Sequence, residues 1–109
     1  MTPFADTDDE DGELPPAPEG ASARDLPIIN RRGLHARASA KFVQTVEKFG
    51  SEVTVSRGGE TVGGRSIMGL LTLGAAQGTS IRVTALGPDQ ESCMEAITAL
   101  LANRFGEDE

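Results

Sequence analysis

Residues 52–62, with the sequence EVTVSRGGETV, decide the fold class of this chain. Residues 52–56 alternate in polarity and are rich in β-branched side chains, a pattern typical of a strand with one buried face. Gly58-Gly59 is typical of a tight hairpin turn, and residues 60–62 supply the returning strand. Because a hairpin pairs its strands antiparallel and helical segments lie on both sides of it, the pattern predicts an α+β fold.

Hydrophobic spacing on either side of the hairpin predicts the remaining elements. Apolar residues recur three and four apart over residues 38–49, which indicates a helix that Gly50 stops. Residues 79–86 alternate strongly, with Ile81, Val83 and Ala85 on one face. The predicted order is βαββαβα: a strand at 25–30 that Pro27 restricts to a sheet edge or a strand start, a helix at 36–48, strands at 52–56 and 60–62, a short helix within 64–74, a strand at 79–86 and a helix over 88–105.

Charge divides the chain into three parts. Residues 1–25 hold eight acidic residues, one arginine and four of the six prolines, so this segment cannot bury enough surface to offset its chain entropy. We expect it to be an acidic, disordered extension. Residues 26–106 carry nine basic and six acidic residues and form the predicted folded domain, and residues 107–109 form an acidic tail. The net charge of −7 therefore arises in the tails, whereas the domain is mildly basic.

The composition excludes several classes of protein. Cys93 is the only cysteine, so we expect a cytoplasmic protein in which Cys93 is a small packed side chain. One cysteine and one histidine make no metal-ligand set, and no cofactor is expected. The sequence has no apolar run long enough for a membrane span, and because residues 1–25 are acidic and lack a hydrophobic segment we expect no secretory signal. Because Trp and Tyr are absent and the domain's positive charge is slight, we expect no nucleic-acid partner. We also expect the protein to be a monomer.

The only histidine, His35, lies where a loop becomes a helix. Gly33 lets the backbone turn just before it, and Arg37 adds a planar cation suited to phosphate oxygens. The first N–H groups of a helix and the positive end of its dipole together form an anion site. A lone histidine is more often a structural or surface residue, but an imidazole in these surroundings predicts reversible phosphorylation of His35.

Two segments resemble one known family. Residues 33–37, Gly-Leu-His-Ala-Arg, resemble the active-site motif of HPr, the histidine-containing phosphocarrier protein of the phosphoenolpyruvate-dependent phosphotransferase system. Residues 64–74, GRSIMGLLTLG, resemble the regulatory-serine segment of the same family. The resemblance extends over residues 26–105. The chain departs from it at Ala38, where the family usually has proline, and at Arg32, where a small polar residue is common.

The resemblance implies both a fold and an activity. The fold is an open-faced sandwich, a four-stranded antiparallel sheet with three helices on one face. His35 accepts a phosphoryl group on its δ nitrogen from phosphorylated enzyme I and passes it to an enzyme IIA-type acceptor. Arg37 stabilises the phosphoryl oxygens. The protein is then a carrier with a transient phosphohistidine and not an enzyme with turnover.

The second segment has a structural and a functional interpretation. Ser66 is a natural N-cap for the short helix, and the resemblance implies regulatory phosphorylation there by an HPr serine kinase/phosphorylase. Leu70 and Leu73 are expected in the core, while Ile67 and Met68 are implied to form an apolar docking patch. Lys41 is expected to be a solvated residue that supports docking by raising the local potential. A modest basic rim for acidic partners is predicted from Arg32, Arg37, Lys41, Lys48 and Arg65.

Two alternatives from other functional classes stay open at this point. The chain could be a regulatory module that binds partners and is switched at Ser66, with His35 secondary. It could instead be a small anion-binding domain in which His35 and Arg37 only hold a ligand. Acid-labile, alkali-stable label on His35 after incubation with enzyme I and labelled phosphoenolpyruvate distinguishes the phosphocarrier from both.

Overall fold

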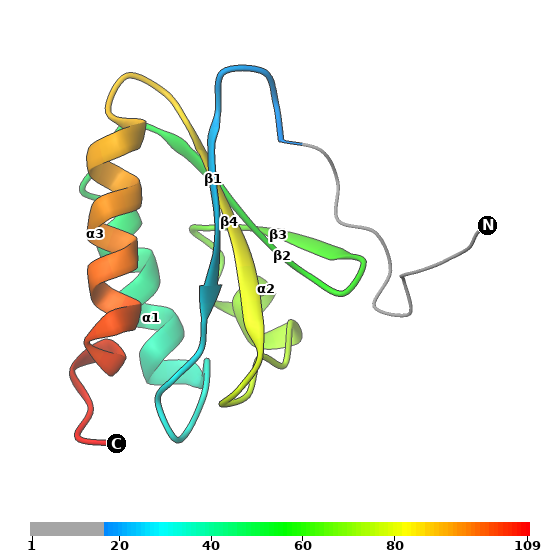
Figure 1. The fold of residues 1–109 in the computed structure, drawn as a ribbon, viewed down its shortest axis with the longest axis vertical. Helices are drawn as coiled ribbons and strands as arrows, with labels where there is room; N and C mark the ends of the chain where they lie inside the picture. Colours follow the sequence, from blue (N-terminus) through cyan, green and yellow to red (C-terminus); the bar gives the residue numbers. More distant parts are fainter. Residues whose placement is uncertain (1–16) are drawn as a thin grey trace.

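The computed structural model describes residues 17–109 and contains one four-stranded antiparallel sheet with helices packed against one face (Figure 1). Along the chain the elements are β1 (Ser22–Pro27), α1 (Ala36–Val46), β2 (Glu52–Arg57), β3 (Glu60–Gly63), α2 (Ile67–Thr72), β4 (Ser80–Leu86) and α3 (Gln90–Ala102), followed by the 3-10 turn η2 (Arg104–Gly106). The predicted order and the predicted open-faced α+β architecture are confirmed.

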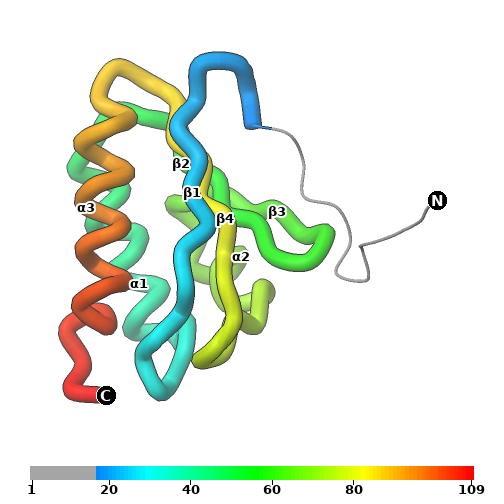
Figure 2. The backbone as a smooth tube through the Cα atoms, in the orientation of Figure 1, coloured from blue at the N-terminus to red at the C-terminus, as the bar shows by residue number. Residues whose placement is uncertain are grey.

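The sheet has the strand order β1-β4-β2-β3, so the first and last strands of the chain lie side by side (Figure 2). β1 is an edge strand, as Pro27 requires, and its Leu26 lies opposite Ile81 of β4. β4 is interior and pairs on its other side with β2. The β2–β3 hairpin turns at Gly58 and Gly59, whose φ angles of 60° and 89° belong to the tight turn that glycine favours.

The hydrophobic core lies between the sheet and the helices. The predicted face of β4 is confirmed, because Ile81, Val83 and Ala85 are buried and alternate with more exposed residues. The predicted core positions Leu70 and Leu73 and the thiol of Cys93 are also buried. The helices contribute Ala38, Phe42, Val43 and Val46 from α1, Leu70 from α2, and Cys93, Met94, Ile97 and Leu101 from α3. Burying one large apolar side chain contributes about 1.5–3 kcal/mol to stability. The buried residues of α1 therefore fix which face of that helix lies on the sheet.

The first strand differs from its predicted position. It runs over Ser22–Pro27 and not over 25–30, so its first residues belong to the segment that we expected to be a disordered extension. Ser22 donates a hydrogen bond to Glu91 of α3, and Arg24 forms a 3.0 Å ion pair with Glu95 of the same helix. These polar contacts attach β1 to α3, and hydrophobic spacing does not reveal them. The part of the predicted extension at residues 1–16 lies outside the described residues.

Both long helices are shorter than predicted. α1 ends at Val46 and not at residue 48, because the N–H groups of Lys48 and Phe49 bond three residues back in a tightened last turn. α3 begins at Gln90, after Asp89 has accepted hydrogen bonds from Ser51 Oγ at 2.5 Å and from the Gly50 amide at 2.9 Å. These bonds lower the pKa of Asp89 and join the start of α3 to the loop after α1.

Within residues 17–109, no helix has the length and apolar character that crossing a membrane requires. No group of three or more His, Cys, Asp or Glu side chains in the same range is placed to hold a metal ion.

Candidate functional site

His35 is the N-cap residue of α1, as the sequence predicts. Its backbone is extended, with φ −78° and ψ −177°, and its carbonyl accepts the Ser39 amide at 2.8 Å, the first helical hydrogen bond. The N–H groups of the first turn therefore have no partner within the helix, and the positive end of the helix dipole lies at His35. An anion held beside this side chain would meet both.

The loop before His35 is fixed by a glycine that cannot be replaced without strain. Gly33 has φ +70°, and a Cβ on it would lie 2.6 Å from the Ala75 carbonyl oxygen. That same oxygen accepts the Leu34 amide at 2.9 Å. Buried Asn30 donates from Nδ2 to the Gly33 carbonyl at 2.8 Å, so the loop is braced from inside.

The acidic tail folds back onto this loop, which the sequence did not predict. Glu107 Oε2 bonds His35 Nε2, and Asn30 Nδ2 donates to Glu107 Oε1 at 3.0 Å. The side chains of His35 and Glu107 are only 18% and 16% exposed. Burial raises the pKa of the Glu107 carboxyl, whereas the hydrogen bonds from Asn30 and His35 lower it. The charges of protonated His35 and of Arg32 lower it further, and the net pKa lies below the ordinary value of 4.5.

The turn after α3 aims the tail at His35. Arg104 and Phe105 both have φ +55°, and this left-handed pair ends the helix before the predicted residue 105. Phe105 is buried, and its carbonyl accepts a 2.7 Å hydrogen bond from Lys41 Nζ. Lys41 is thus half-buried and tied to the tail, and the expectation of a solvated side chain is wrong. Packing and this hydrogen bond hold a backbone conformation that non-glycine residues seldom adopt.

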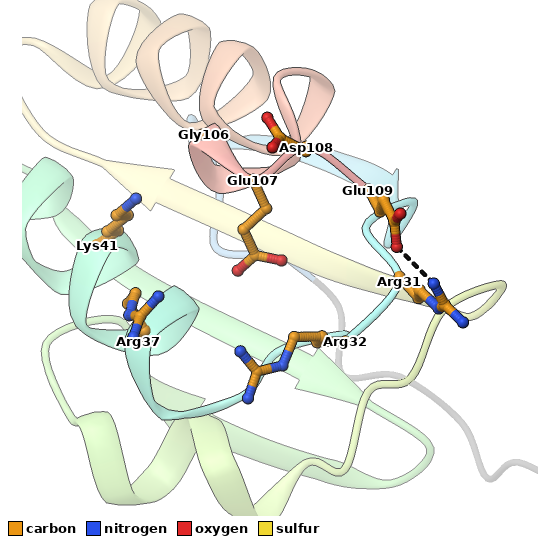
Figure 3. A pocket seen from close by; sticks show the side chains of 8 residues that line it. All are labelled: Arg31, Arg32, Arg37, Lys41, Gly106, Glu107, Asp108 and Glu109. Carbon is orange, nitrogen blue, oxygen red and sulfur yellow. Dashed lines mark hydrogen bonds and ion pairs between the residues drawn. The ribbon is translucent and has the colours of Figure 1, made fainter.

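Cationic side chains and the tail line an open pocket of about 620 Å³, and Glu107 of this lining also bonds His35, which itself is not part of the lining. Figure 3 shows Arg32 and Arg37 on one side and the Glu107 carboxylate reaching from across into the space between them. The lining residues are Arg31, Arg32, Arg37, Lys41, Gly106, Glu107, Asp108 and Glu109. Arg31 is paired with the Glu109 side chain at 2.5 Å, whereas Arg32 and Arg37 form no ion pair with any described residue. These two guanidinium groups are therefore available to an anion.

The predicted basic rim is only partly assembled. Arg32, Arg37 and Lys41 line the pocket together with Arg31, which the prediction left out. Arg65 lies elsewhere and donates to the Phe49 carbonyl at 3.0 Å, and Lys48 is exposed outside the pocket lining. The rim is narrower than expected because Lys48 lies beyond the far end of α1 and Arg65 lies in the β3–α2 loop.

The Ser66 segment is built as the structural interpretation requires. Ser66 is the N-cap of α2, and its Oγ accepts the Gly69 amide at 2.9 Å. Ile67 and Met68 are 40% and 71% exposed, while Leu70 turns into the core. α2 packs against α1, so this exposed apolar pair belongs to the helix next to the one that carries His35.

Fold and site together define a small open-faced α+β sandwich whose only histidine starts its first helix beside a cationic pocket. A family model described as "PTS HPr component phosphorylation site" matches residues 22–103. The chain belongs to the HPr family, the phosphocarrier proteins of the phosphotransferase system, which are carriers and not enzymes. The family resemblance stated from the sequence is thereby confirmed.

Several relatives and solved structures are similar over nearly their whole length. HPr of Cupriavidus necator is 50% identical over 86 residues, which cover 79% of this chain and 97% of that protein. HPr of Xylella fastidiosa is 50% identical over 84 residues, which cover 77% of this chain and 94% of that protein. The crystal structure of HPr-C-His from Thermoanaerobacter tengcongensis has a TM-score of 0.77 at 39% identity and covers 81% of this chain and 99% of its own.

Proposed function

We propose that His35 is the phosphoryl acceptor, loaded by phosphorylated enzyme I and unloaded by an enzyme IIA-type domain. The observation that carries the proposal is the placement of the only histidine at the N-terminus of α1, beside a pocket with two unpaired arginines. Neutral imidazole is a nucleophile at cellular pH, and family membership supplies the context of phosphoryl transfer.

The proposed transfer of the phosphoryl group uses His35 and the groups around the start of α1. The lone pair of Nδ1, the nitrogen that the family resemblance implies, attacks phosphorus in line. The bond between phosphorus and the donor breaks, and its electron pair stays on the donor. Arg37, Arg32 and the free N–H groups of α1 face the phosphoryl oxygens and stabilise their charge. Onward transfer to the acceptor reverses these steps.

Docking and regulation are proposed for the α2 segment. Exposed Ile67 and Met68 form the apolar surface on which donor and acceptor bind, and a flexible methionine suits two different partners. Lys41 of α1, although half-buried, adds positive charge on the neighbouring helix and so supports docking. Phosphorylation of exposed Ser66 by an HPr serine kinase/phosphorylase would place about two negative charges next to this surface and weaken docking.

The acceptor assignment is tested with enzyme I and radiolabelled phosphoenolpyruvate. We expect acid-labile, alkali-stable label on the wild-type protein and none on His35→Ala. Arg37→Ala should slow loading and unloading without abolishing either, because Arg37 stabilises charge and forms no bond. Arg57→Ala serves as a control, since Arg57 lies on β2 and donates to the Leu73 carbonyl at 3.1 Å, away from the pocket lining. Label on His35→Ala, or none on the wild-type protein, would refute the assignment.

A further inference from the structure

The contact between His35 and Glu107 leaves one imidazole nitrogen unoccupied. Nε2 is bonded to the Glu107 carboxylate, and no described residue is hydrogen-bonded to Nδ1. A carboxylate accepts hydrogen bonds and donates none, so Nε2 carries the proton in this pair. In neutral imidazole the lone pair is then on Nδ1.

The Glu107 carboxylate is itself held in place. Its second oxygen accepts from Asn30 Nδ2, and the same amide nitrogen donates to the Gly33 carbonyl. Because both bonds need a donor at that atom, they fix which way the buried amide of Asn30 faces. The carboxylate thus bridges a rigid amide and the imidazole, as the aspartate of a catalytic triad bridges its surroundings and a histidine.

The tail carries Glu107 to this place through contacts on both sides of it. Before Glu107, buried Phe105 and the Lys41 hydrogen bond anchor the turn. After it, the backbone N–H of Arg31 donates to the backbone oxygen of Glu109 at 2.5 Å. Residue 107 lies beyond the residues that the family model matches, which end at 103.

We propose that Glu107 is a positioning residue for phosphoryl transfer, accepting the Nε2 proton of His35 so that the Nδ1 lone pair points out to the phosphoryl donor. This inference rests on the proposed function of His35. When the Nδ1–P bond forms and the donor keeps its electron pair, the ring gains a positive charge while Nε2 retains its proton. The Glu107 carboxylate stabilises that charge, and the charge disappears again when the acceptor removes the phosphoryl group.

The opposite role is the competing outcome. Glu107 reaches into a pocket whose cations also face the phosphoryl oxygens, so the tail could instead obstruct the site. The two roles predict opposite changes in the rate of loading. Removing an obstruction speeds loading, and removing a positioning group slows it.

The first measurement needs no phosphoryl donor. In ¹⁵N-detected NMR of the full chain at a pH where His35 is neutral, we expect an Nε2–H resonance shifted downfield and protected from exchange. Glu107→Ala should abolish both the shift and the protection, and Glu107→Gln should keep part of them because an amide oxygen still accepts. Glu47→Ala is the control: it removes the same charge from an exposed residue just beyond the far end of α1, whose side chain has no hydrogen bond or ion pair within residues 17–109 and lies outside the pocket lining.

The second measurement is the rate of loading by enzyme I. Glu107→Ala should slow it roughly ten- to a hundredfold, the effect of losing a hydrogen bond to a charged group. The loading rate of Glu107→Gln should fall between those of Glu107→Ala and the wild-type protein, and Glu47→Ala should load at the wild-type rate. Equal rates or faster loading in Glu107→Ala would overturn the positioning role. An unlabelled wild-type protein that still shows the Nε2–H resonance would instead refute the proposed function of His35, and this inference with it.

Discussion

At the scale of single residues, the site depends on one backbone position that tolerates only glycine. Gly33→Ala combines a left-handed φ with a contact of 2.6 Å between Cβ and the Ala75 carbonyl oxygen. We expect a loss of about 2 kcal/mol in the free energy of unfolding, measured by urea denaturation. Gly74→Ala is the matched control, since Gly74 has φ +61° but nothing within 4 Å of a new Cβ. Equal losses in the two variants would show that the close approach costs nothing.

Glu107 predicts a particular dependence of stability on pH. Its folded-state pKa lies below 4.5, so its contribution is fully present above that value and is lost as the pH falls through the lower folded-state pKa. We expect the unfolding free energy to fall more steeply below pH 4.5 in the wild-type protein than in Glu107→Gln. Urea titrations at a series of pH values measure this difference. Parallel curves for the wild-type protein and Glu107→Gln would contradict the contact.

Two substitutions of Ser66 distinguish its role as a helix cap from its proposed role as a regulatory site. Ser66→Ala removes the acceptor for the Gly69 amide and should cost about 1 kcal/mol in thermal or urea unfolding, with near-normal loading of His35. Ser66→Asp keeps a capping oxygen and should stay folded, but its charge beside Ile67 and Met68 should weaken enzyme I binding and slow loading. Equal loading rates in Ser66→Asp and the wild-type protein would leave Ser66 as a cap alone.

At the scale of elements, the start of α1 can be tested at the position where this chain departs from its family. The first helical hydrogen bond is made by Ser39, so a proline at residue 38 removes no bond. We expect Ala38→Pro to change the free energy of unfolding by less than about 1 kcal/mol. Ala40→Pro, inside the helix, should cost about 3 kcal/mol or more. Similar losses in the two unfolding experiments would mean that α1 begins elsewhere.

Elements with a clear period were predictable, and those set by polar contacts were not. The hairpin, α1 and β4 follow from alternation or a helical stripe, because the hydrophobic effect acts on that pattern directly. β1 begins three residues earlier than predicted because Ser22 and Arg24, which give no hydrophobic signal, join it to α3. The turn at Arg104 and Phe105 has no signature, since neither residue favours positive φ.

At the scale of the whole molecule, the sequence predicted His35 and Arg37 as site residues but did not predict that the tail lies against them. From the distribution of charge we predicted a mildly basic domain over residues 26–106 and a separate acidic tail at residues 107–109. The sequence shows that Arg31 and Glu109 have opposite charges. It does not show that they form an ion pair, because that contact depends on the turn at residues 104–105, which tertiary packing stabilises. Residues distant in sequence therefore complete the site, and a short motif around the histidine could not contain them.

The strand order has a consequence for how the chain folds. Among the described strands, β1 pairs only with β4, which is made after α1, the β2–β3 hairpin and α2. A chain that emerges from the ribosome with its N-terminus first can form α1 and the β2–β3 hairpin early, because their contacts are local. β1 must wait with its backbone unpaired until Leu86 has emerged. We therefore expect that closing the long loop between the two strands limits the folding rate, and that the unpaired edge of β1 is where the nascent protein is exposed to wrong pairing.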